Sequence, residues 1–343
     1  MKQLNVLFVC LGLVAASCTI PEPQSVCGEH MEGYVEIDGR CVGNREESCD
    51  KTKEAKVSCT ESNETYDATA NACICNAPYF RVNGKCVASS SLAVGDLVEF
   101  GRYPQSENSD LPSPLTWQVL DIKDDAVLML SKYVLEQYQY HDADEYITWE
   151  KSNVRSYLNA LSGKYNKNNI DHTKNGFIDR AFGTEEQKRI KEVTNKNPKP
   201  PENWESTPGG NDTEDWGSTP SGNDTKDKVF LLSYYEVVQY FPTFKSRVAS
   251  PTAYAIHPPE SSGRNNLYTC QVTCSGDDSC SESSCNDDGI NARECSNVQY
   301  ISHWWLRSPD GSFASGVDCD GGVNDDDVDF DNSGLRPALY VSF

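Results

Sequence analysis

Short runs in which apolar and aromatic residues alternate with polar ones begin after residue 93 and are typical of β-strands. The first three runs are 95–103 (GDLVEFGRY), 117–121 (WQVLD) and 126–130 (AVLML). Lys and Asp residues at 123–125 separate the second run from the third and favour a turn. We therefore predict one strand and then a β-hairpin at the start of a large domain.

A stretch with apolar residues at helical spacing follows this predicted hairpin. Ser152 precedes the first such stretch, so it is expected to cap a helix. Residues 177–182 predict a second short helix. A predicted strand over 227–232 leads into Ser233 and Glu236, which have the spacing of a capping box at the start of a third helix.

The C-terminal part of the chain again has the pattern of strands. The predicted strands are 303–309, 313–319, 323–331 and 335–341. A tight turn at 320–322 should join the second to the third. In the third strand we expect Val328 and Phe330 on the buried face, and Asn324 and Asp326 pointing outward.

Two insertions, at about 195–226 and 257–299, interrupt the large domain. The first is rich in Pro, Gly, Asn and Asp, and its near-repeat of twelve residues begins at Trp204 and again at Trp216. Such a composition buries too little apolar surface to order itself, so we expect a surface loop. The second insertion holds five of the later cysteines.

The first residues have the pattern of an export signal. Lys2 is followed by an apolar run over 4–16, which is too short to span a bilayer and suits a cleaved signal segment. The small residues before Cys18 resemble the bacterial lipobox, which implies a signal peptide over 1–17 and a lipid on the Cys18 thiol. Thr19 in place of Asp implies an outer-membrane or cell-surface location. The alternative is an ordinary secretory signal with Cys18 in a disulfide.

Cysteines are dense in two clusters outside the signal region. The first cluster is Cys27, Cys41, Cys49, Cys59, Cys73, Cys75 and Cys86, and the second is Cys270, Cys274, Cys280, Cys285, Cys295 and Cys319. In an exported chain this density predicts disulfides, because thiols are not kept reduced there. Neither cluster contains the CxxC spacing of a structural zinc site.

Residues 18–92 are expected to form a small disulfide-rich stalk, because they hold too few apolar residues for a core of their own. Residues 73–86 resemble the last part of an EGF-like module. This resemblance implies a Cys75–Cys86 disulfide. The other pairings stay open, since seven cysteines are an odd number.

The formal charge is −22 and the pI about 4.6. Such an acidic surface repels nucleic acid and anionic lipid, so membrane contact is expected through the lipid anchor only. It is compatible with calcium, with basic partners or with simple solubility.

Seven motifs between residues 93 and 343 resemble an uncharacterised bacterial domain family. They are FGRYPQ (100–105), TWQVLD (116–121), TWEKSNVRSYLN (148–159), DKVFLLS (227–233), PTAYA (251–255), WWLRSP (304–309) and GLRPAL (334–339). That family resembles the C-type-lectin and formylglycine-generating-enzyme fold. The resemblance implies an α+β, C-type-lectin-like mixed domain over 93–343, with its last strand packed against one near its N-terminus.

The last two motifs contain the expected structural residues. Trp304 and Trp305 should place one ring in the core and one toward the loops. Arg307 and Arg336, which precedes Pro337, should be buried and should each pair with a carboxylate.

Polar residues on the third C-terminal strand and its turn form the candidate ligand site. They are Asp318, Asp320, Asn324, Asp325, Asp326, Asp327, Asp329 and Asp331. Calcium takes six to eight oxygen ligands and could bind here, although the alternative is a solvated acidic face. Residues 323–325 resemble a lectin calcium signature without its Trp. The alternating polar pattern is also similar to targets of diversity-generating retroelements.

Catalytic motifs are absent from the sequence. The histidines His30, His141, His172, His257 and His303 form no HExxH, and no GxSxG is present. A formylglycine-generating activity would need a reactive thiol, for which Cys319 is the candidate; a disulfide to the inserted loop is favoured instead. We therefore expect a surface lipoprotein that binds a protein or glycan ligand, without cofactor or catalysis. The alternatives are such an enzyme, a diversified binding protein or a structural envelope component.

Overall fold

The computed structural model describes residues 59–200, 221–274, 280–282, 299–310, 312–331 and 333–343, together with two strands near the N-terminus. The chain divides into two compact units, Met1–Ser58 and Cys59–Phe343. In the first unit, β1 (Tyr34–Ile37) pairs with β2 (Arg40–Gly43) as an antiparallel hairpin. The expected lipidation site, Cys18, lies outside the described residues.

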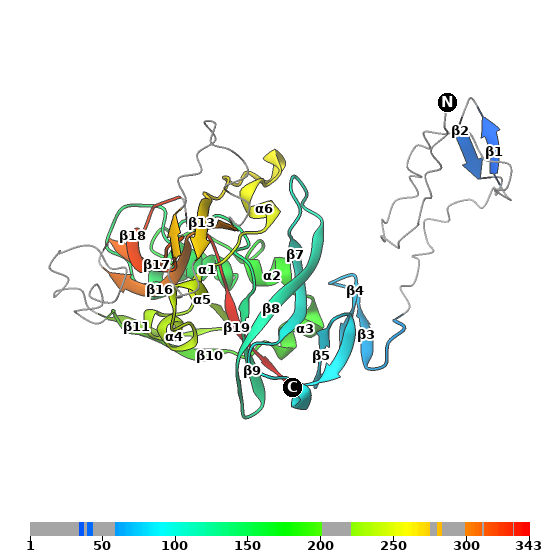
Figure 1. Cartoon of the computed structure of the whole chain (residues 1–343), viewed down its shortest axis with the longest axis horizontal. Coiled ribbons are helices and arrows are strands. Elements are labelled where there is room, and N and C mark those ends of the chain that lie inside the picture. Colours follow the sequence, from blue (N-terminus) through cyan, green and yellow to red (C-terminus); the bar gives the residue numbers. More distant parts are fainter. Residues whose placement is uncertain are drawn as a thin grey trace. The chain divides into compact units, whose positions relative to one another are not determined.

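A seven-stranded antiparallel sheet runs through the second unit (Figure 1). Its order is β12-β19-β9-β8-β7-β5-β6. The strands are β5 (Tyr79–Val82), β6 (Lys85–Ala88), β7 (Leu97–Pro104), β8 (Pro112–Lys123), β9 (Ala126–Ser131), β12 (Val229–Phe230) and β19 (Ala338–Ser342). The last strand, β19, lies between β9 and β12, so the C-terminal segment is an interior strand of the sheet.

The local sequence signals form the predicted elements. β8 and β9 pair as a hairpin around Asp124, whose φ of 50° suits a tight turn. Ser152 accepts a hydrogen bond from the Arg155 amide at the start of α1, and Ser233 and Glu236 form the capping box of α4. The helices are α1 (Asn153–Leu158), α2 (Phe177–Ala181), α3 (Thr184–Arg189), α4 (Tyr234–Tyr240), α5 (Phe244–Arg247) and α6 (Ala253–Ile256). The unit is therefore a mixed α and β structure, mainly β with short helices.

Smaller antiparallel sheets complete the unit. They are β3 (Glu64–Asp67) with β4 (Ala72–Cys75), β10 (Val193–Asn197) with β11 (Gly222–Asp227), the sheet of β13 (Cys270–Cys274), β14 (Cys280–Glu282) and β15 (Gln299–Ile301), and the sheet of β16 (Trp304–Asp310), β17 (Phe313–Val317) and β18 (Val323–Asp327). The two ends of the first predicted insertion thus pair as strands, while Trp204 and Trp216 lie outside the described residues.

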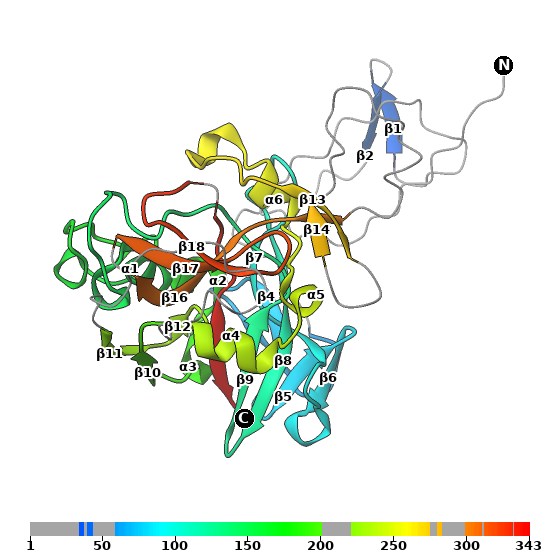
Figure 2. The same cartoon turned by 60° about the vertical axis from the view of Figure 1, so that its left-hand side comes forward.

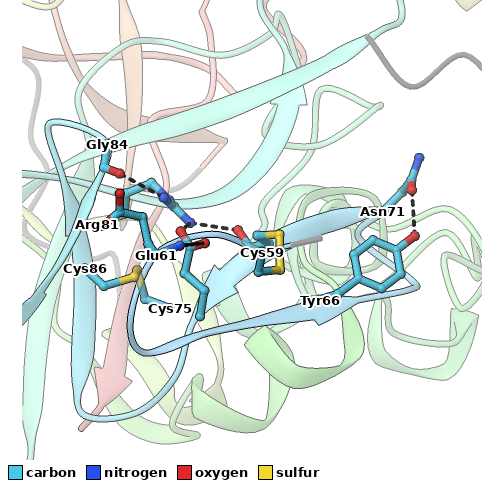
Figure 3. Close-up of a disulfide and its surroundings, with 10 residues drawn as sticks. Cys59, Glu61, Tyr66, Asn71, Cys75, Arg81, Gly84 and Cys86 are labelled. Carbon is cyan, nitrogen blue, oxygen red and sulfur yellow. Dashed lines mark hydrogen bonds and ion pairs between the residues drawn. A yellow bond between two sulfur atoms is a disulfide. The ribbon is translucent and has the colours of Figure 1, made fainter. Parts of the chain in front are cut away.

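Residues 59–92 belong to the same compact unit as the large sheet. Disulfides Cys59–Cys73 and Cys75–Cys86 cross-link this segment, and the second is the expected pair (Figure 3). β5 extends the sheet by pairing with β7, and Phe80 is buried in the main core. This segment therefore packs onto the sheet, whereas its composition predicts a stalk that continues to residue 92.

The contact with α3 explains how this segment docks. The Asp67 carboxylate accepts a hydrogen bond from the Glu185 amide at 3.0 Å, in the first turn of α3. Arg189, at the other end of α3, donates to the Cys75 carbonyl at 2.9 Å. Among the described residues, no helix is long and apolar enough to cross a membrane.

Candidate functional site

The three-stranded sheet β16-β17-β18 carries the predicted ligand site (Figure 2). Trp305 is opposite Gly316 in β17, and Gly316 is opposite Asn324 in β18. Val317 and Val323 also face each other, and both are buried. The predicted turn at 320–322 joins β17 to β18, with Gly321 at a φ of 85°. The hairpin therefore has apolar support beneath its polar residues.

Both motif tryptophans are fully buried, so the prediction that one ring faces the loops is wrong. Trp304 and Trp305 each have 0% exposure. Trp305 Nε1 donates to the Tyr138 carbonyl at 2.8 Å, and Trp304 Nε1 donates to the Arg247 carbonyl at 3.2 Å. Because each indole N–H has a backbone acceptor, both rings can be buried without an unsatisfied donor.

The two motif arginines differ in their partners. Arg307 forms the predicted ion pair, with Glu236 of α4, and donates to the Leu231 carbonyl at 2.6 Å. Arg336 instead donates to the Ser131 carbonyl at 3.0 Å, and its guanidinium lies 4.7 Å from the Trp304 ring centroid. The predicted carboxylate pairing is therefore wrong for Arg336: backbone carbonyls and an aromatic face replace it, and burial lowers its pKa.

Pro337 extends the structural role of this motif. Its carbonyl accepts a hydrogen bond from the Ser131 amide at 2.8 Å, where β9 and β19 adjoin. The motif around Arg336 and Pro337 thus connects the last strand to the central sheet.

The eight polar candidates do not converge on one point. Two are exposed, namely Asp327 and Asp331, and six are partly buried, namely Asp318, Asp320, Asn324, Asp325, Asp326 and Asp329. Asp320 stays within the turn, where its Oδ1 accepts from the Gly322 amide at 2.7 Å. Asn324 and Asp326, which were expected to point outward, are both partly buried: Asn324 lies beside Asp318, and Asp326 lies beside His303.

His303, which precedes β16, forms a cluster with Asp318, which follows β17, and Asp326 of β18. His303 Nδ1 lies 3.5 Å from Asp318 Oδ1 and 3.8 Å from Asp326 Oδ2. Burial raises the pKa of Asp318 to about 6; His303 opposes this rise, and the nearby Asp326 carboxylate adds to it. The Asp318 carboxyl is therefore costly to ionise in the folded protein.

This cluster could hold a metal ion, because one donor atom from each residue lies within 4.8 Å of the others. One imidazole and two carboxylates suit zinc or another transition metal better than calcium, which takes only oxygen ligands and more of them. The remaining aspartates of the hairpin do not join the cluster. Of the eight polar residues of the hairpin that the sequence offers as calcium ligands, only Asp318 and Asp326 belong to this cluster.

Cys319 ends the hairpin strand in a disulfide. It is bonded to Cys270 of β13, at the edge of the second insertion, and is 0% exposed. The predicted pairing of Cys319 with a cysteine of the inserted loop is therefore confirmed. The enzyme alternative would require this bond to be reduced. The side chains of Cys274, Cys280, Cys285 and Cys295 lie outside the described part of the chain.

The sequence did not reveal a cavity of about 460 Å³ next to the hairpin sheet. Arg180, Arg264, Tyr138, Tyr157 and Asn153 are among the residues that line it. They come from α1, α2 and loops that are far apart along the chain, so no local motif marks them. The hydrogen bond from the Tyr138 amide to the Ser333 carbonyl places one wall beside the segment that follows the hairpin.

Comparison with curated proteins gives no significant match, and neither does comparison with solved structures. A family model, described as a domain of unknown function (DUF6273), matches residues 124–343. The match includes α1, the capping box of α4, the buried tryptophans and the last strand. The chain belongs to this family of domains of unknown function.

Proposed function

We propose that the protein is an exported, surface-anchored ligand-binding protein, and that the hairpin β17–β18 is its recognition surface. The observation that carries this proposal is the contrast within the hairpin. Ala314 and Val317 of β17 and Val328, just after β18, have 0% exposure, whereas Asp327 at the end of β18 is exposed. A fixed framework that presents polar side chains is how binding loops are commonly built.

The disulfide strengthens the framework argument. The Cys270–Cys319 bond ties the end of the hairpin strand to β13 across a sequence separation of 49. Such a cross-link limits the motion of the turn at 320–322 and so lowers the entropy lost when a ligand binds. It also supports export, because disulfides persist in oxidising compartments.

The C-type-lectin-like fold is part of the same proposal. Its support is the position of β19, which returns the C-terminal segment to the central sheet after the separate hairpin sheet. The ligand is a protein or a glycan, and the charge of −22 favours one with basic or hydroxyl groups over an anionic polymer.

Binding of the full chain to whole cells and to a glycan array tests this function. The hairpin variant Asp326→Asn/Asp327→Asn should lose most binding and keep its melting temperature, because Asp327 is exposed and Asn keeps the size of the partly buried Asp326 side chain. The control variant Asp124→Asn/Asp179→Asn removes the same charge from exposed positions elsewhere. Equal binding by the two variants would show that the hairpin is not the recognition surface.

A further inference from the structure

A second cavity, of about 530 Å³, is formed by segments that are far apart along the chain. Its walls are Gln118 of β8, Lys132 and Tyr133 after β9, α5 with the residues that follow it, one residue each of β13 and β15, and Arg336 before β19. The volume lies in the range of small-molecule sites. Three of the residues that line it are cations, namely Lys132, Lys245 and Arg336, and none of the described residues that line it is acidic.

The guanidinium of Arg336 is buried without a counter-charge. Arg336 is 3% exposed, and its neighbours are the backbone carbonyls of Ser131 and Arg247 and the face of the Trp304 ring. Burial lowers the pKa of Arg336 to about 9, and no carboxylate of the described chain opposes this effect, so the group is still charged at neutral pH. A buried charge without a counter-charge is costly, and an anion in the cavity would offset this cost.

One nitrogen of this guanidinium can donate to a ligand. Arg336 Nε and Nη1 donate to the two backbone carbonyls, at 3.0 and 3.4 Å. Nη2 donates to no residue of the described chain and is accessible, unlike the buried unpartnered nitrogens of Arg189 and Gln137. Gln118 and Ser250 also line the cavity, and their side chains make no hydrogen bond within the described chain. The cavity thus presents one charged donor and neutral polar groups to a ligand.

Two lysines add positive charge to the same cavity. Lys132 is partly buried and Lys245 is exposed. Within the described chain neither forms an ion pair, whereas Lys191 and Lys196 each pair with an aspartate. The cavity is therefore a local concentration of positive charge in a chain with a formal net charge of −22. At an ionic strength of about 0.15 M, carboxylates farther away than about 8 Å are largely screened, so the net charge does not prevent an anion from binding here.

The remaining wall of the cavity is apolar. Val248, Val272 and Ile301 line it, and they pack with the buried disulfide Cys270–Cys319. Cations on one side and branched aliphatic side chains on the other suit a small molecule that has a strongly anionic group on an apolar body.

From this geometry we infer that the cavity is a binding site for a phosphate monoester with an apolar organic group. The phosphoryl group accepts from Arg336 Nη2, Lys132 and Lys245 supply further positive charge, and the organic group lies against the apolar wall. A phosphate monoester carries a charge of about −1.5 to −2 at pH 7 and three acceptor oxygens, which suits three cations better than the single charge of a carboxylate. The inference goes beyond the hairpin function and does not depend on it, because none of the hairpin's polar residues lines the cavity.

Calorimetric titration of the full chain with phenyl phosphate, at about pH 7.5 and an ionic strength of about 0.15 M, tests this site. Phenyl sulfate has nearly the same shape with one negative charge fewer, so phenyl phosphate should bind about tenfold more tightly. Inorganic phosphate lacks the organic group and should bind more weakly than phenyl phosphate. The hairpin variant Asp326→Asn/Asp327→Asn should bind phenyl phosphate as the unmodified protein does, which separates this site from the recognition surface.

Two double variants locate the site within the protein. Lys132→Gln/Lys245→Gln should weaken binding of phenyl phosphate by about tenfold or more. It should keep its melting temperature, because neither lysine is buried or forms an ion pair in the described chain. The control Lys174→Gln/Lys228→Gln also removes one exposed and one partly buried lysine, both outside the cavity, and should bind as the unmodified protein does.

In crystals soaked with phenyl phosphate, the phosphoryl group should lie within hydrogen-bond distance of Arg336 Nη2. A phosphoryl group bound elsewhere would overturn the inference, as would absence of binding by folded protein at about 10 mM phenyl phosphate. Equal affinity for phenyl phosphate and phenyl sulfate would contradict a site for a phosphate monoester. Equal affinities of the two lysine double variants would show that the cavity is not where the anion binds.

Discussion

The hairpin sheet and the cavity beside it differ in how the chain builds them. The hairpin sheet is one continuous segment, residues 304–327, in which buried tryptophans lie under partly exposed aspartates. The cavity combines α1, α2 and the loop at 262–265, and Arg180 and Arg264 line it together with Asp110 and Asp142. One region thus presents negative charge on a local scaffold, and the other brings charges of both signs together by tertiary packing.

This difference shows which kind of site a sequence reveals. A surface on one hairpin leaves a local alternation of apolar and polar residues, which the order of the amino acids alone displays. A cavity assembled from distant segments leaves no such pattern. If framework and surface in the hairpin sheet are separate, substitutions in the buried framework should destabilise the protein, and substitutions on the surface should not.

The largest effect should come from the framework. Trp305→Ala removes a ring with 0% exposure and leaves its backbone acceptor at Tyr138 unpaired, so we expect a loss of roughly 3–5 kcal/mol in the free energy of unfolding. Urea denaturation measures it. Asp327→Ala, on the exposed side of the same sheet, should change stability by no more than about 0.5 kcal/mol. Similar losses in both variants would mean that framework and surface are not separate.

The disulfide should give the next largest effect. Cys270→Ala/Cys319→Ala opens a cross-link with a sequence separation of 49, and we expect a loss of roughly 2–4 kcal/mol. Before reduction, Cys319 should resist alkylation in mass spectrometry because it is bonded and buried. A freely alkylated Cys319 in the native protein would contradict the bond and favour the enzyme alternative.

A smaller effect should depend on pH. The folded-state pKa of Asp318 is about 6 against an ordinary 3.8, so the ionised carboxylate destabilises the folded protein above pH 6 and the cost disappears below about pH 4. Asp318→Asn should therefore raise the free energy of unfolding by about 1–2 kcal/mol at pH 7.5. The gain should shrink through pH 5 and vanish near pH 3.5. A gain of equal size at both ends of this range would show that ionisation is not its cause.

Most elements of the large domain were predictable because their signals are local. The strand runs, the turn at 123–125 and the capping box of Ser233 and Glu236 each depend on a few neighbouring residues. Val328 is buried as predicted, although it follows the end of β18 at Asp327, whereas Phe330 is only partly buried. Such signals predict elements but not their partners.

The features that escaped prediction depend on tertiary contacts. Nothing near Phe80 indicates that β5 would join the central sheet, since its partner β7 follows the intervening strand β6. Both tryptophans can be buried without an unsatisfied donor because backbone carbonyls far along the chain accept their N–H groups. Arg336 likewise donates to backbone carbonyls that only the folded chain brings to it. Arg180 and Arg264 meet only after α2 and the loop at 262–265 have packed together.

Photo-crosslinking tests the proposed recognition surface most directly. A photoreactive amino acid at position 327 of the full chain should form crosslinks to the bound cell-surface or glycan-conjugate ligand, and the same amino acid at position 179, also exposed, should not. Crosslinks at 327 that disappear when unlabelled protein competes would agree with recognition by the hairpin. Equal yields at the two positions, or crosslinks at 179 alone, would contradict it.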